Sequence, residues 1–107
     1  KFIAHAAGNF NAAGPINVTA IADGNGAQLA SADIDITAGN ALMLHGFKSL
    51  ASASEHGGGG NVAAIAGASL KARVINDQGN ASVTAVMGGH SGCQFNAAAS
   101  LNANARA

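Results

Sequence analysis

The sequence predicts an all-β fold: a parallel β-solenoid of about four to five coils, or a related stacked-β filament subunit. First, apolar and polar residues alternate over short runs, which is typical of half-buried strands. Second, Gly-Asn pairs begin at positions 8, 24, 39, 60 and 79 and so recur every 15 to 21 residues, which suggests one coil per interval. Third, Ala, Gly, Asn and Ser make up 61 of 107 residues, so large apolar side chains are too few for an ordinary sandwich. A solenoid needs fewer, because each coil fills only a thin interior.

The alternation is clearest in residues 34–53, where Ile34 and Ile36 share one face and Asp35 lies on the other. Gly39-Asn40 interrupts the run, and shorter alternating runs follow it. The pattern predicts that Leu42, Leu44, Leu50, Leu70, Val74 and Val83 are buried, and that Asp35, Lys71 and Arg73 face solvent or a neighbouring subunit.

In the N-terminal region, the alternation predicts one strand with a weak pattern, followed by a second strand with a clearer pattern. Phe2, Ala4 and Ala6 alternate in residues 1–14. Pro15 lacks a backbone donor, so it should precede a strand that carries Ile16 on its inner face. Residues 23–26 then form a strong turn signal.

Residues 55–60 contain four consecutive glycines and predict a Gly-rich loop. Alternation resumes over 61–75 and 82–87, with turns at 76–79 and 88–92. Helix is the competing interpretation for residues 95–107, because Ala is the best helix former. Gly or Asn recurs every few residues and no helical period is sustained, so a strand is expected there.

Residues 34–44 and, more loosely, 62–72 read apolar-x-apolar-x-Ala-Gly-x-x-Leu-x-Leu. This pattern resembles the repeats of filamentous-haemagglutinin-type exoproteins, across roughly residues 16–105. The resemblance implies a right-handed parallel β-solenoid and a surface-exposed adhesive role, with no catalytic residues to carry over. The composition is also partly similar to that of bacterial functional amyloids, whose Asn ladders would correspond here to Asn102 and Asn104 or to corner residues. Those corner residues are Asn17, Asn40, Asn61 and Asn80.

Candidate chemistry is sparse. His90 and Cys93 have a metal-like spacing, but no second pair of ligands has a suitable spacing, so no metal site and no cofactor are expected. Cys93 is the only cysteine, which leaves an intermolecular cross-link open as an alternative to a simple turn residue. The sequence contains no nucleophile elbow and no phosphate loop, so it predicts a protein that is not an enzyme.

The expected role is that of a structural protein, a self-assembling extracellular fibre subunit or adhesin repeat region, in which residues 1–107 form a single domain. The chain starts at Lys1 without Met or a signal sequence, which suggests a mature or excised piece of a longer protein. A net charge of zero favours self-association, and the lack of a basic surface argues against nucleic acid. No apolar run approaches 18 residues, so no membrane insertion is expected.

The expected partner is the chain itself, in a homopolymer at the bacterial cell surface, for example in a biofilm. The alternative is a carbohydrate- or surface-binding module that recognises glycans of a host or neighbouring cell. The expected polymer contacts are Phe2, Phe10, Phe95, Leu101, Asn102 and Asn104.

Overall fold

The computed structural model describes residues 1–90 and 92–106, in which all regular structure is β-strand. The first coil contains β1 (Phe2–Ala6), β2 (Phe10–Asn11) and β3 (Ile16–Gly24). The second contains β4 (Gln28–Ala38), β5 (Ala41–Leu44) and β6 (Phe47–Glu55). The third contains β7 (Gly60–Ala72), β8 (Val74–Asp77) and β9 (Ala81–Gly88), and β10 (Cys93–Ala105) begins a fourth level.

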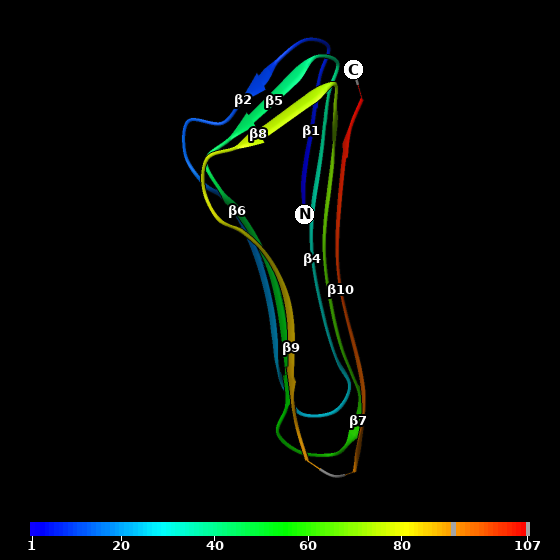
Figure 1. Cartoon of the computed structure of the whole chain (residues 1–107). Helices are drawn as coiled ribbons and strands as arrows, with labels where there is room; N and C mark the ends of the chain where they lie inside the picture. Colours follow the sequence, from blue (N-terminus) through cyan, green and yellow to red (C-terminus); the bar gives the residue numbers. More distant parts are fainter. Residues whose placement is uncertain (91, 107) are drawn as a thin grey trace.

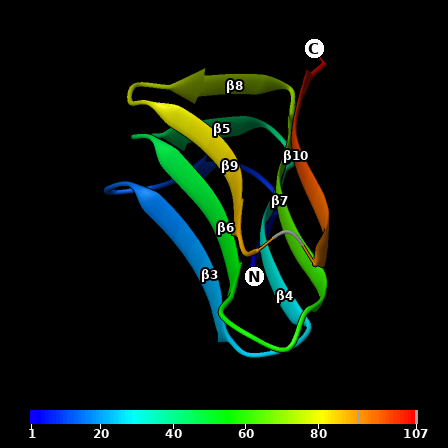
Figure 2. The ribbon, with the colours of Figure 1, turned by 90° about the horizontal axis from the view of Figure 1, so that it is seen from below.

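The strands stack into three parallel sheets, which confirms the predicted β-solenoid (Figures 1 and 2). Sheet A has the order β1-β4-β7-β10, sheet B has β2-β5-β8 and sheet C has β3-β6-β9. Paired residues are 31 positions apart at Ile16 and Phe47, and 34 apart at Gln28 and Val62. The solenoid therefore has about three turns, fewer than expected, because one coil contains about two of the glycine breaks and each break marks a corner.

Backbone hydrogen bonds between coils have a consistent direction. Inward-facing residues donate to the following coil, as in Ala12 N–H to the Met43 carbonyl at 2.9 Å. Outward-facing residues donate to the preceding coil, as in Gly39 N–H to the Ala6 carbonyl at 2.9 Å. Arg106, just after β10, follows the same rule and donates to the Ala72 carbonyl at 2.9 Å. In each strand, inward residues thus bond in one direction along the stack and outward residues in the other.

The cross-section has a wide end and a narrow end (Figure 1). At the wide end sheet B separates sheets A and C, and large apolar side chains fill the space between the three sheets. At the narrow end sheets A and C enclose mostly alanines. The buried residues of the wide end are Ile34, Ile36, Ala38, Leu42, Leu44, Phe47, Ala68, Leu70 and Ala72. Those of the narrow end are Ala30, Ala32, Ala51, Ala53, Val62, Ala64 and Ala66.

Most of the predicted alternation is confirmed. Phe2, Ala4 and Ala6 face inward, Pro15 immediately precedes β3, and residues 93–105 form a strand. The residues confirmed as buried are Leu42, Leu44 and Leu70, while Val83 is half-buried against the core. Lys71 and Arg73 are exposed, and Asp35 is half-buried in the outer row of β4.

The predicted register is wrong at two residues that were expected in the core. Val74 is 53% exposed, because β7 ends at Ala72, Arg73 forms a corner, and Ile75 becomes the inward residue of β8. Leu50 is half-buried in the outer row of β6. Residues alternate along this strand, and its neighbour Ser49 takes the inward position. Ser49 tolerates this position because its hydroxyl donates to the Ala32 carbonyl at 3.0 Å.

The predicted Gly-rich loop at 55–60 is shorter in the structure. Glu55 is the last residue of β6 and Gly60 is the first of β7, so the connection spans 56–59. Gly58 and Gly59 have φ angles of 87° and 71°, a left-handed conformation that favours glycine. The glycines therefore shape a tight corner and do not form a long loop.

Candidate functional site

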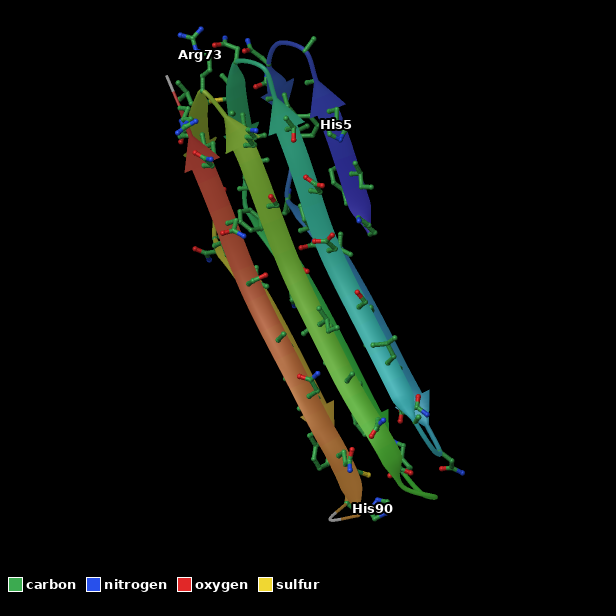
Figure 3. The ribbon with its side chains drawn as sticks, turned by 90° about the vertical axis from the view of Figure 1, so that its right-hand side faces the viewer. His5, Arg73 and His90 are labelled. Atoms are coloured by element: carbon green, nitrogen blue, oxygen red, sulfur yellow. The ribbon has the colours of Figure 1, made fainter. Side chains whose placement is uncertain are left out.

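The residues predicted to make polymer contacts lie at the two opposite ends of the stack. Phe2 and Phe10 belong to β1 and β2 in the first coil, whereas the other four lie in β10. β1 and β10 are the two edge strands of sheet A, which Figure 3 shows from its outer face. The structure thus groups the predicted residues into two separate surfaces.

The surface at β10 has an apolar row and a polar row. Phe95 and Leu101 are in register with Val62 and Ala68, which face inward, yet they are 48% and 49% exposed. Among the described residues, the strands of sheets B and C end one level below β10, so they leave these side chains uncovered. At the other surface, Phe2 and Phe10 are half-buried against the wide-end core.

The outer row of β10 does not form an Asn ladder within the chain. Asn102 is in register with Ser69, and Asn104 is in register with Lys71. One Asn-Asn contact does form at a corner, where Asn40 Nδ2 donates to Asn9 Oδ1 at 2.8 Å. Of the corner residues expected to stack, Asn40 therefore contacts a matching Asn in the preceding coil, which forms one step of the expected ladder.

A second group of residues gathers at the tip of the narrow end, at the corners where sheet C passes into sheet A. Glu55 ends the inward row of β6, and its side chain is 0% exposed. Glu55 Oε1 accepts backbone N–H groups from Gly26 at 3.2 Å, Gly57 at 2.5 Å and Gly59 at 3.2 Å. These donors belong to two successive corners, so a single carboxylate oxygen joins two coils.

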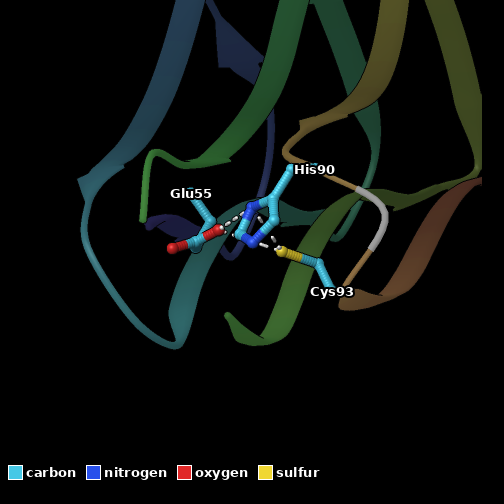
Figure 4. Close-up of side chains that lie close together, drawn as sticks. All are labelled: Glu55, His90 and Cys93. Carbon is cyan, nitrogen blue, oxygen red and sulfur yellow. Dashed lines mark hydrogen bonds and ion pairs between the residues drawn. The ribbon is translucent and has the colours of Figure 1, made fainter. Parts of the chain in front are cut away.

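The other oxygen, Glu55 Oε2, faces two polar side chains from the next level (Figure 4). Cys93 Sγ lies 3.0 Å from this oxygen, and His90 Nδ1 lies 2.8 Å from it. The Cys93 hydrogen bond, helped by the backbone N–H donors, outweighs desolvation and lowers the pKa of Glu55 to about 2. The same hydrogen bond, together with burial, raises the pKa of the Cys93 thiol.

This arrangement does not match a nucleophilic triad. In a triad the imidazole bridges nucleophile and acid through its two different nitrogens. Here His90 Nδ1 faces both partners, at 2.8 Å from Glu55 Oε2 and 3.6 Å from Cys93 Sγ. A raised thiol pKa also lowers the fraction of reactive thiolate, which disfavours Cys93 as a cross-linking residue.

Glu55 is the member of this group that the sequence does not single out. The sequence predicts a loop at this position because four glycines follow closely after it. The signal that could have identified it is the alternation of β6, in which Phe47, Ser49, Ala51 and Ala53 face inward and Glu55 is next in the row. An acidic residue at an inward position requires partners that satisfy its charge.

Comparisons with protein-family models, with curated proteins and with solved structures find no match for this chain. Within residues 1–90 and 92–106, no helix is long and apolar enough to cross a membrane.

Proposed function

We propose that the chain is a non-enzymatic structural subunit whose copies stack end to end into an extracellular fibre. The observation that carries this proposal is the direction of the ladder between coils. Just after β10, the outward residue Arg106 donates to the preceding coil, so the N–H and C=O groups of the alternate, inward residues of β10 such as Leu101 and Ala103 point away from β7 to the free edge. At the edge of β1, the backbone N–H and C=O groups of outward residues such as Ile3 and His5 point away from β4.

These two edges are complementary halves of the ladder that already joins each coil to the next. A second copy in the same orientation presents the outward groups of β1 to the inward groups of β10 and so forms a parallel pair. Such a contact joins two different surfaces and leaves a fresh edge on each copy, so it generates an open filament and not a closed dimer. A net charge of zero leaves little repulsion between copies.

The resemblance of residues 34–44 and 62–72 to haemagglutinin-type repeats supports a place outside the cell and an adhesive role for the fibre. A glycan-binding module is the rival function, and it commonly needs aromatic side chains on an outer face. All four phenylalanines lie in inward rows here: Phe2, Phe10, Phe47 and Phe95. This placement favours a fibre subunit over a glycan-binding module.

The substitution Ala103→Pro tests this proposal. The Ala103 N–H points to the free edge. Proline at this position therefore removes a donor that the next copy needs, and it leaves the hydrogen bonds to β7 intact. We expect the variant to fold, as judged by circular dichroism, and to stop filament growth in light-scattering and electron-microscopy assays.

Two comparison variants make the result specific. Ala103→Ser keeps the N–H and should assemble like the parent chain. Asn102 is an outward residue whose N–H points to β7, so Asn102→Pro removes a hydrogen bond within the chain and no donor at the free edge, and it should lower the melting temperature. If Ala103→Pro folds and still assembles as readily as the parent chain, pairing through the β10 edge is wrong.

A further inference from the structure

We propose that Glu55, His90 and Cys93 form a binding site for a transition-metal ion, with Zn²⁺ as the best match. Their ligand atoms all lie within 4.8 Å of one another. Glu55 and Cys93 are 38 positions apart in the sequence. The fold brings the three residues together from β6, from the corner after β9 and from the start of β10. The site does not depend on the proposed fibre, because all three residues belong to one chain.

The size of the site suits a small tetrahedral ion. The three distances are 2.8 Å from His90 Nδ1 to Glu55 Oε2, 3.0 Å from Cys93 Sγ to the same oxygen, and 3.6 Å from Sγ to Nδ1. Zinc bonds to O, N and S of about 2.0–2.3 Å place tetrahedral ligands about 3.3–3.7 Å apart. The sulfur and the nitrogen already have this separation, and the carboxylate oxygen has to move by only about 0.5 Å.

The carboxylate is held in place before any ion arrives. Three backbone N–H groups orient Glu55 Oε1, which leaves Oε2 directed at His90 and Cys93. Hydrogen-bonded ligating groups of this kind limit how far a site rearranges when the ion binds. Without an ion, the hydrogen bond from the Cys93 thiol and the ion-pair contact of His90 Nδ1 hold the three groups in the arrangement that the metal bonds would take.

The donor set selects the class of metal. A thiolate, an imidazole and one carboxylate oxygen suit Zn²⁺ and similar ions, whereas Ca²⁺ and Mg²⁺ prefer oxygen ligands alone. Three protein ligands leave a fourth position for water. That position can open onto a hollow of about 390 Å³ lined by Glu55, His56, Gly89 and His90, among others.

The ion would act as a clip between the corners of successive coils. Glu55 closes the second coil, while His90 and Cys93 belong to the passage from the third coil to β10. These corners are rich in glycine and offer few side chains that could pack together. Because binding requires a deprotonated thiol, it should release a proton and become weaker at acid pH.

Cobalt titration of the metal-free chain, prepared without a histidine tag, tests the site. Co²⁺ reports on zinc sites because a thiolate ligand gives a charge-transfer absorption band and four-coordination gives strong visible bands. We expect one Co²⁺ per chain, displaced by Zn²⁺. Cys93→Ser should abolish the charge-transfer band, and His90→Ala should weaken binding at least about tenfold.

His45→Ala is the matched control, since His45 is also exposed but lies at a different corner, between β5 and β6. It should bind Co²⁺ like the parent chain. The His90 side chain is 53% exposed, so His90→Ala should still fold. Zn²⁺ should raise the melting temperature of the parent chain and leave that of His90→Ala unchanged. Absence of the charge-transfer band in the parent chain, or its persistence in Cys93→Ser, overturns the proposal.

Discussion

The wide and narrow ends of the solenoid are built on the same ladders but have different interiors. At the wide end, Leu42 and Ile36 project into a space bounded by three sheets. At the narrow end, Ala64 and Ala53 line the space between two sheets. The size of the inward side chains therefore sets the distance between sheets, while the backbone ladder sets the distance between coils.

A cavity at the wide end should have the largest effect. Leu42 is 0% exposed and lies between Phe10 and Ile75 in the neighbouring coils. Leu42→Ala should lower the free energy of unfolding by about 2–5 kcal/mol, because the surrounding strands cannot close the space left by the side chain. Met43→Ala, on the outer face of the same strand, should cost much less in chemical denaturation. Equal effects of the two substitutions would contradict the assignment of the wide-end core.

Overpacking the narrow end should have an intermediate effect. Ala64 is 0% exposed and in register with Ala30 and Ala97. Ala64→Leu should lower the free energy of unfolding by about 1–3 kcal/mol, because a larger side chain pushes sheets A and C apart. Ala63→Leu, which faces outward, should have little effect in the same denaturation assay. A fully tolerated Ala64→Leu would show that alanine size does not set the sheet separation.

Acid should weaken the tip of the narrow end without changing the wide end. The pKa of Glu55 falls from an ordinary value of 4.5 to about 2, chiefly through the Cys93 hydrogen bond. Its ionised form therefore stabilises the fold fully above pH 4.5, and this contribution is lost as the pH falls towards 2. Cys93, His90 and the backbone N–H groups of the corner face this carboxylate.

Thermal melting of the metal-free chain between pH 6 and pH 2 measures this loss. Glu55→Gln should be less stable than the parent chain at pH 6, and its melting temperature should fall less steeply over the acid range. Parallel pH profiles of the two chains would show that ionised Glu55 does not stabilise the fold.

The sequence predicts the solenoid well, because period-two alternation identifies strands and inward residues such as Ile34 and Leu44 directly. It predicts corners less well, since a single corner residue such as Arg73 reverses which residues face inward. The Glu55 group was not predicted, because its members are brought together only by stacking at about 33 residues per coil, and the spacing of glycine breaks suggested a shorter coil.

The axial rise of the assembled filament, measured by electron microscopy, distinguishes end-to-end pairing of β10 with β1 from other modes of assembly. Each copy contributes four strands to sheet A, so pairing of β10 with β1 of the next copy predicts a rise of about 19 Å, or four strand spacings. This arrangement leaves one strand position per copy unfilled in sheets B and C, at the level where Phe95 and Leu101 lie. A rise of about 14 Å, three spacings, would show that sheets B and C pair instead. Dispersed monomers at high concentration would contradict end-to-end assembly itself.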